Sequence, residues 1–200
     1  MDAFRGHPHP SEEKSVTTIG YIIGSLSSTS INRALVEAIA KLAPEGVELV
    51  EIPIAGLPFY SQDREADFPQ VAKDFKQAIV DVDGVLIATP EYSRSIPGVL
   101  KNAFDWSTRP YGDMSFSGKP VAIIGASGGP ISTAAAQQHL RAIMGHFNAI
   151  VMGQPEGMIQ YAPGLITDER DIANDGTKEF LAGYLQAFVG LIERVRKANA

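Results

Sequence analysis

Residues 16–42 read VTTIGYIIGSLSSTSINRALVEAIAKL and contain one complete unit of the fold. The first nine of these residues are mostly apolar or β-branched, which predicts a strand over 16–24. A hydroxyl-rich loop follows, and from Ile31 to Leu42 the apolar residues recur at helical spacing. The unit is therefore a strand, a loop and a helix, and its repetition along the chain decides the fold class.

The same alternation continues towards the C-terminus. The runs YIIG, VLIA and VAIIG are apolar throughout, as in strands that are covered on both faces. We therefore expect an α/β fold, a three-layer doubly wound sheet of five parallel strands that binds ligands at the carboxyl ends of its strands. The expected strands are 16–24, 47–52, 84–89, 120–127 and 149–153, and the expected helices are 31–42, 70–80, 98–107, 132–147 and 177–197.

The composition bounds the class of protein. Hydrophobic residues make up 44% and charged residues 20% of the 200 positions, which is typical of a globular chain. The chain has no cysteine, so thiolate chemistry is excluded and redox chemistry would need a bound cofactor. The net charge of −6 provides no general attraction for nucleic acid. No apolar run has the length of a membrane-spanning helix.

Residues 1–15 are polar and lack periodicity, so we expect a disordered tail followed by one domain over 16–200. His7 and His9 lie in this tail, and we do not expect them to form a metal site. The tail has no apolar segment like that of a signal peptide, which predicts a cytoplasmic protein. The expected partners are small molecules rather than nucleic acid or membranes.

The first loop, residues 24–32, joins the first strand to the first helix and carries five hydroxyl groups. Backbone amides at a helix N-terminus together with hydroxyl donors suit a phosphate group. The loop lacks the lysine of GxxxxGK[ST] and the pattern GxGxxG, which argues against nucleoside triphosphates and dinucleotides. An ordinary serine-rich helix cap explains the loop equally well, so both interpretations stay open.

Two further loops follow the third and fourth strands. The second loop, residues 89–98, has prolines near both ends and offers backbone amides, Tyr92 and Arg94, which suits the rim of a flat heteroaromatic ring. The third loop, residues 125–132, contains Gly128 and Gly129, which allow close approach of a ligand to the backbone. A connecting loop with a surface tyrosine and an ordinary tight turn are the alternatives. Three such loops at three strand ends favour a binding site.

Three segments resemble the NADPH-dependent FMN reductase family, the flavodoxin-like group that contains bacterial quinone, azo-compound and chromate reductases. They are GSLSSTSINRAL, TPEYSRSIPGVLKNAFDW and GASGGPIS, and the resemblance extends over about residues 17–190. It implies a flavodoxin-like sheet of strand order 2-1-3-4-5, non-covalently bound FMN, and NADPH or NADH as the hydride donor. It also implies ping-pong transfer to quinones, azo compounds or chromate, and assembly into homodimers or homotetramers.

The resemblance assigns site residues position by position. Those that match the family's phosphate loop and its two ring-contacting segments are Ser25, Ser27, Ser30, Asn32, Pro90, Glu91, Tyr92, Ser93, Ser127 and Gly128. The role implied for Glu91 is binding, mainly through its backbone, and no residue is assigned to acid–base catalysis or to a metal. Ser27 stands where the family often has arginine, so one charge-assisted phosphate contact is missing and FMN affinity is expected to be lower.

The second loop departs from the family at Ser93 and Arg94, where many members have asparagine and glycine. Because Arg94 is a cation at the lip of this loop in an acidic chain, we predict that it binds anionic substrates. A solvated surface arginine is the alternative. Phe104 and Trp106 are expected in the core or in a subunit interface. We also expect helix 98–107 to expose more aromatic and apolar surface than the sheet can cover, and the family resemblance implies that this helix pairs across a two-fold axis.

Three functions are compatible with these residues. The main prediction is an enzyme, an FMN-dependent NAD(P)H oxidoreductase that reduces small-molecule acceptors. The alternatives are a flavodoxin-type electron carrier and a redox-sensing FMN-binding protein. Carriers of the flavodoxin type usually flank the flavin with aromatic residues and are strongly acidic. Here the second loop has one tyrosine and the net charge is a moderate −6, which favours the enzyme.

Overall fold

The computed structural model describes residues 16–200, so the tail with His7 and His9 lies outside the described residues. The strands are β1 (Thr17–Ile23), β2 (Val47–Glu51), β3 (Gly84–Ala88), β4 (Pro120–Ser127), β5 (Ile150–Val151) and β6 (Gly157–Gln160). The helices are α1 (Ile31–Ala40), the 3-10 helix η1 (Gln62–Arg64), α2 (Gln70–Val80), α3 (Gly98–Ser107), α4 (Ala134–His146) and α5 (Asp175–Asn199). Within residues 16–200, none of these helices combines the length and apolar character needed to cross a bilayer.

The sheet has the order β2-β1-β3-β4-β5 with parallel pairing throughout, which confirms the predicted order. Its edge beside β4 differs from the single strand expected over 149–153. β5 has only two residues, whereas the additional strand β6 pairs with the second half of β4, from Ile124 to Ser127. Pro155 lies between β5 and β6 and has no N–H to donate to a ladder, which explains why the edge strand is interrupted.

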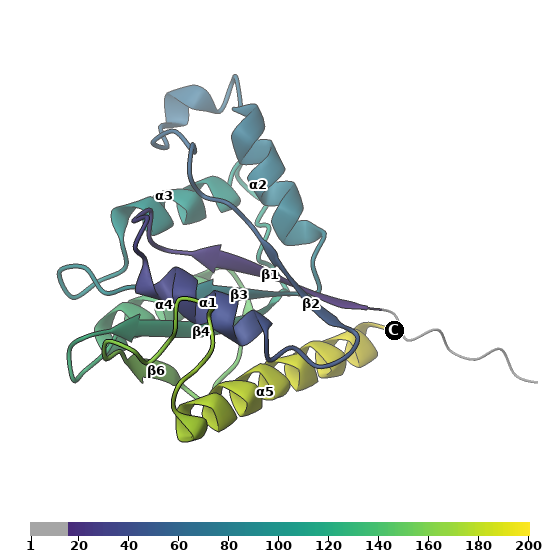
Figure 1. Ribbon diagram of the computed structural model, residues 1–200. Helices are drawn as coiled ribbons and strands as arrows, with labels where there is room; N and C mark the ends of the chain where they lie inside the picture. The colour runs from purple at the N-terminus through teal and green to yellow at the C-terminus, as the bar shows by residue number, and fades with distance from the viewer. Residues whose placement is uncertain (1–15) are drawn as a thin grey trace, which may run out of the picture.

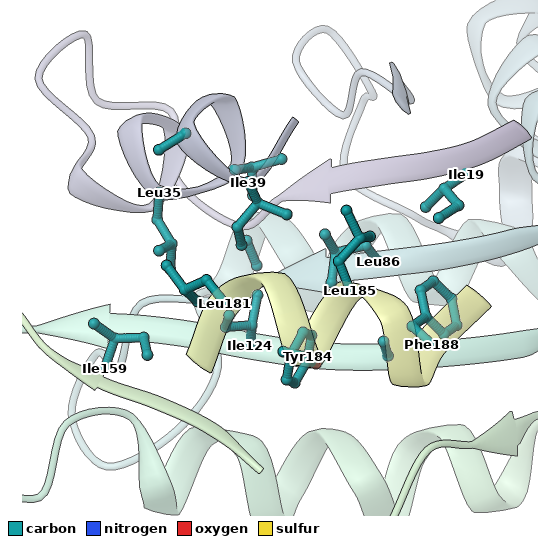
Figure 2. Packing of buried hydrophobic residues seen from close by; sticks show 14 of the residues in the cluster. Ile19, Leu35, Ile39, Leu86, Ile124, Ile159, Leu181, Tyr184, Leu185 and Phe188 are labelled. Atoms are coloured by element: carbon teal, nitrogen blue, oxygen red, sulfur yellow. The ribbon is translucent and has the colours of Figure 1, made fainter. Parts of the chain in front are cut away.

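Helices cover both faces of the sheet (Figure 1). α1 and α5 pack on one face, where α5 runs along the strands, and α2, α3 and α4 pack on the other. Figure 2 shows the first of these cores, in which Leu35 and Ile39 of α1 and Leu181 and Phe188 of α5 meet the strands. All five residues of β3 are buried, as its uninterrupted apolar run predicts. This packing brings the loops after β1, β3 and β4 to the same edge of the sheet.

The expectation that α3 exposes aromatic surface is wrong. Phe104 and Trp106 have no exposed surface, because they pack against the sheet and the loop that precedes α2. Trp106 donates its indole N–H to the carbonyl oxygen of Pro58 at 2.8 Å and meets the rings of Tyr60 and Phe68 edge-on. The irregular stretch 53–69 covers the aromatic side of the helix, which its sequence does not reveal.

Candidate functional site

The first, second and third loops meet in one pocket of about 260 Å³ at the carboxyl ends of β1, β3 and β4. Nine of the predicted site residues line it, whereas Ser93 and Arg94 do not. The residues around the pocket are Ser25, Ser27, Thr29, Ser30, Ile31, Asn32, Pro90, Glu91, Tyr92, Ala126, Ser127 and Gly128. The structure therefore brings together three segments that are far apart in the sequence, at the edge of the sheet where ligands of this fold class bind.

The hydroxyl groups of the first loop hold the loop by accepting hydrogen bonds from backbone amides. The Ser27 N–H donates to Ser25 Oγ at 3.3 Å, and the Thr29 N–H donates to Ser27 Oγ at 3.2 Å. Ser30 caps α1, because its Oγ accepts from the Arg33 N–H at 3.2 Å. A hydroxyl that accepts one bond still carries its own proton, so these serines can donate to a ligand.

The start of α1 offers backbone donors to the same pocket. Within the described residues, no protein group accepts a hydrogen bond from the amides of Ile31 and Asn32, the first two positions of the helix. Such unpaired amides and the helix dipole attract a negative charge. The residues that line the pocket include no lysine, arginine or histidine, so the donor set is neutral.

Asn32 is used differently from the way the sequence predicts. Its side chain is buried and turned towards β4, where Nδ2 donates to the carbonyl oxygen of Ala126 at 3.0 Å and Oδ1 accepts from the Ala126 N–H at 2.9 Å. The carboxamide therefore joins the first loop to β4. The backbone N–H of Asn32, which has no partner among the described residues, is left for a ligand in the pocket.

Glu91 anchors the second loop to α4. One carboxylate oxygen, Oε2, accepts from the N–H groups of Ala135 and Ala136 at 3.0 and 3.1 Å. The carboxylate thus caps α4 from a distant part of the chain, since Thr133 at the N-cap position makes no such bond. Its side chain is 11% exposed, and Arg94 Nη1 lies 3.8 Å from Oε1. The arrangement makes Glu91 a structural acceptor and leaves the Pro90–Tyr92 backbone to face the pocket.

The tip of the second loop is a tight turn with an unusual backbone. Tyr92 and Ser95 exchange two backbone hydrogen bonds of 3.0 Å, and the two residues between them have φ values of 52° and 65°. Turns with two left-handed residues favour Asn-Gly, so Ser93 and Arg94 adopt this conformation at a cost. The Arg94 side chain is 73% exposed, and Ser95 Oγ lies 3.0 Å from Nδ1 of the exposed His139.

The third loop is held by its own serines. Ser127 Oγ donates to the Ser132 carbonyl oxygen at 2.8 Å and accepts from the Gly129 N–H at 3.3 Å, so both of its hydrogen-bonding roles serve the loop. Gly128 is exposed at the pocket and is available for close approach of a ligand. Gly125 was not predicted as important, yet a β-carbon there would lie 2.3 Å from the Thr89 carbonyl oxygen.

Three pocket residues were not predicted. Thr29 belongs to the hydroxyl run and was visible as a candidate, and Ile31 contributes its unpaired N–H. Ala126 has no chemical signal in the sequence, because only the fold brings its backbone to Asn32. Within residues 16–200, no group of three or more histidine, aspartate or glutamate side chains is suited to a metal ion.

Three larger cavities lie elsewhere, of about 550, 450 and 430 Å³. The partly buried Lys119 of the first cavity and the buried Lys76 of the second already serve the fold. Lys119 Nζ donates to two carbonyl oxygens near the end of α2, and Lys76 Nζ donates to those of Ser107 and Asp113. Burial lowers the pKa of both ammonium groups. Because the protein itself engages these two ammonium groups, we place the ligand site at the three loops, where the amides of Ile31 and Asn32 have no partner among the described residues.

The geometry fits a ligand with one phosphate group and one flat ring. The phosphate would meet the free amides of α1 and the serine hydroxyls, and the ring would lie between the backbone of Pro90–Tyr92 and that of Ser127–Gly128. FMN has this combination of parts. A neutral set of oriented donors suits a phosphate dianion without a metal ion or a P-loop lysine.

Comparisons with known proteins agree with this geometry. A model of the family described as "NADPH-dependent FMN reductase" matches residues 17–164. A "2-hydroxy-1,4-benzoquinone reductase" of Burkholderia sp is 45% identical over 174 residues, which cover 87% of this chain and 95% of the relative. A "Quinone reductase" of Escherichia coli (strain K12) is 40% identical over 192 residues, which cover 93% and 99%. The solved structure of the flavoenzyme NAD(P)H:(acceptor) oxidoreductase from Paracoccus denitrificans superposes with a TM-score of 0.86 at 40% identity, covering 90% of this chain and 98% of that one.

Proposed function

The chain belongs to the NADPH-dependent FMN reductase family and is an oxidoreductase that uses FMN and NAD(P)H; from this premise we propose that it reduces quinones. Chromate and azo compounds are further acceptors in this proposal, because an open flavin face discriminates little among small oxidants. We also place the enzyme in the cytoplasm. The observation that carries the proposal is the single pocket in which free helix N-terminal amides adjoin two backbone-lined loops.

The chain's own residues bind and orient rather than exchange protons. The first loop would hold the FMN phosphate through the amides of Ile31 and Asn32 and the hydroxyls of Ser25, Ser27 and Ser30. When bound, FMN supplies the two-electron redox chemistry between NAD(P)H and the acceptor. Glu91 is occupied as a helix cap, which agrees with a site that works by orientation and not by acid–base catalysis.

The test of this function is a reduction and reoxidation experiment on the purified full-length protein. We expect the visible absorption of an oxidised flavin, its loss on anaerobic addition of NADPH, and its return when a quinone is added. A flavin that NADPH does not bleach would indicate a carrier that needs a partner reductase. Bleaching without recovery by any small acceptor would favour a redox sensor. Absence of flavin binding by the reconstituted protein would reject the proposal.

Arg94 supports a more specific proposal for the same enzyme, the recruitment of anionic substrates. Its guanidinium is largely exposed, and its contact of 3.8 Å to Glu91 is too long for a hydrogen bond and leaves its donors free. Glu91 itself is neutralised in part by the N-terminus of α4, so the lip of the second loop keeps a local positive charge. Such a charge offsets the repulsion between an acidic protein and NADPH or chromate.

Steady-state kinetics of Arg94→Ala test this role. The substitution should raise KM for NADPH or for chromate, affect a neutral quinone much less, and reduce the dependence of the rate on salt. Arg94→Lys is the matched control, because it keeps the charge and an equally strained backbone. Equal changes for anionic and neutral substrates, or none at all, would show that Arg94 is an ordinary surface residue.

We further propose that the chain forms homodimers, which associate into homotetramers. The buried aromatic residues of α3 do not support this, but large apolar side chains on the loops do: Phe59 is 83% and Tyr111 is 90% exposed. Tyr92 and Ile131, beside the pocket, are each about half exposed. Apolar side chains in such positions are typical of an interface. Sedimentation of the FMN-loaded protein at micromolar concentration should give a dimer or larger species, and a monomer would contradict the proposal.

A further inference from the structure

The contact between Asn32 and Ala126 joins the two halves of the pocket. The two residues are 94 positions apart in the sequence and exchange two hydrogen bonds, of 3.0 and 2.9 Å. Both residues are 1% exposed, so water cannot replace either bond. The pair is therefore a fixed connection between the start of α1 and the end of β4.

Each end of this connection carries a different part of the binding site. On one side, Asn32 is the second residue of α1, and the free amides of Ile31 and Asn32 itself face the phosphate position. On the other side, Ala126 directly precedes Ser127 and Gly128, which line the ring position. The distance between the phosphate position and this side of the ring position therefore depends on the Asn32 carboxamide.

The side chain of Asn32 has little capacity left for a ligand. Its oxygen and one of its two N–H groups are bonded to Ala126, and the residue lies below the surface of the pocket. The Ser30 hydroxyl, two positions earlier, is partly exposed and lines the same pocket. The two side chains therefore have different roles: Ser30 can contact a phosphate group, whereas Asn32 is bonded to β4.

We propose that Asn32 is a positioning residue whose side chain sets the spacing between the phosphate cradle and the ring-binding backbone without itself contacting the cofactor. This inference rests on the proposed binding of FMN. Without the carboxamide, the free protein would spend less time with both halves in register, and the apparent affinity falls by the fraction of molecules that are competent. This loss applies to any flavin, with or without a phosphate.

Flavin titrations of the full-length protein after removal of bound flavin test the proposal. Asn32→Ala should weaken the binding of FMN and of riboflavin by the same factor, about tenfold. The reason is that the buried N–H and carbonyl oxygen of Ala126, beside the ring position, lose their hydrogen-bond partners. Ser30→Ala is the matched control on the same helix turn, and it should weaken FMN while leaving riboflavin unchanged. A loss of FMN affinity without loss of riboflavin affinity in Asn32→Ala would show direct phosphate binding and overturn the proposal.

A second variant covers the case in which Asn32→Ala does not fold. Asn32→Asp keeps the size of the side chain and its acceptor oxygen, but it places a second carboxylate oxygen against the Ala126 carbonyl oxygen. Riboflavin is the ligand to measure, because it has no phosphate group that the new negative charge could repel. We expect weaker riboflavin binding and, at saturating FMN, a shifted visible spectrum of the bound ring; unchanged riboflavin affinity and spectrum would contradict the proposal. Wild-type protein that binds neither flavin would instead reject the proposed function.

Discussion

The first and second loops line the same pocket but are held in place in different ways. In the first loop, the side chains of Ser25, Ser27 and Ser30 bond to amides two or three residues away. In the second loop, the Glu91 carboxylate bonds to α4, which lies 44 and 45 residues further along the chain. The local bonds leave the serine hydroxyls at the pocket, where they can donate to a ligand, whereas the distant bonds tie one carboxylate oxygen of Glu91 to the fold.

Because the loops are held differently, their substitutions should affect flavin affinity and protein stability to different extents. Substitutions in the exposed part of the first loop should change the binding of a phosphate and leave the free energy of unfolding nearly unchanged. Substitutions in the second and third loops should change both quantities together, because there the side chains act by placing the backbone. Four predictions test this distinction.

The largest effect is expected at Gly125, the first residue of the third loop, which lies in the last part of β4. In Gly125→Ala the new β-carbon would lie 2.3 Å from both the Thr89 carbonyl oxygen and Thr133 Oγ1. Because the backbone of Thr89 cannot move without disturbing β3, we expect a loss of about 3 kcal/mol in the free energy of unfolding, with weaker FMN binding. Urea denaturation and flavin titration measure the two quantities.

Gly128→Ala is the matched control within the same loop. A β-carbon there meets nothing nearer than the Tyr161 carbonyl oxygen at 3.9 Å, so stability should change by less than about 0.5 kcal/mol. If Gly125→Ala and Gly128→Ala lost equal stability, the close contacts of the β-carbon at residue 125 would not be the cause of the loss.

The next largest effect is expected for Glu91→Ala. The variant loses two charge-assisted hydrogen bonds to the N-terminus of α4, which should lower the free energy of unfolding by about 2 kcal/mol and weaken flavin binding with it. Glu91→Gln keeps an acceptor and should lose about half as much. Weaker FMN binding with unchanged stability would place Glu91 in contact with the ligand and erase the difference between the two loops.

A smaller effect, limited to affinity, is expected for Ser27→Arg in the first loop. Ser27 is exposed and the residues around the pocket provide no cation, so an arginine would add a charge-assisted contact to the phosphate. We expect FMN binding to tighten by about tenfold, riboflavin binding to stay the same, and stability to change by less than about 0.5 kcal/mol. An equal gain for riboflavin would mean that residue 27 does not face the phosphate.

The smallest effect is expected for the salt bridge between Arg33, in the first turn of α1, and Glu51 of β2. The pair is partly exposed, and the hydrogen bond from Arg33 lowers the pKa of Glu51 below its ordinary value of 4.5. Its contribution is therefore present above pH 4.5 and is lost as the pH falls through the lower folded-state pKa. Glu51→Gln should cost less than about 0.5 kcal/mol at neutral pH, and this cost should diminish as the pH falls below 4.5. A difference that persists in acid would mean that the side chains act by packing and not by charge.

The outcome of the sequence predictions follows the same division. The helices that begin at Ile31, Gln70 and Gly98 lie where their apolar spacing predicts them, because periodicity is a property of neighbouring residues. The hydroxyl run also marked the first loop as a candidate phosphate cradle, with a serine-rich helix cap as the alternative, and the phosphate role stays a prediction. The strand β6 was missed because Pro155 interrupts the edge, and its four residues are recognisable as a strand only beside β4.

The sequence alone therefore predicts the alternating fold, the three loops at the strand ends and, through the family resemblance, the ligand of these loops. The partners of individual side chains, in contrast, depend on the tertiary structure. Asn32 was assigned to the phosphate loop by motif, yet its side chain bonds to Ala126. Glu91 was assigned a binding role mainly through its backbone, and only the structure shows that its side chain bonds to the start of α4. The burial of Trp106 against Pro58 and Tyr60 likewise depends on a segment that is distant in the sequence. The physical reason is that a polar side chain takes the partners that burial leaves it, and those partners come from distant segments that local sequence does not specify.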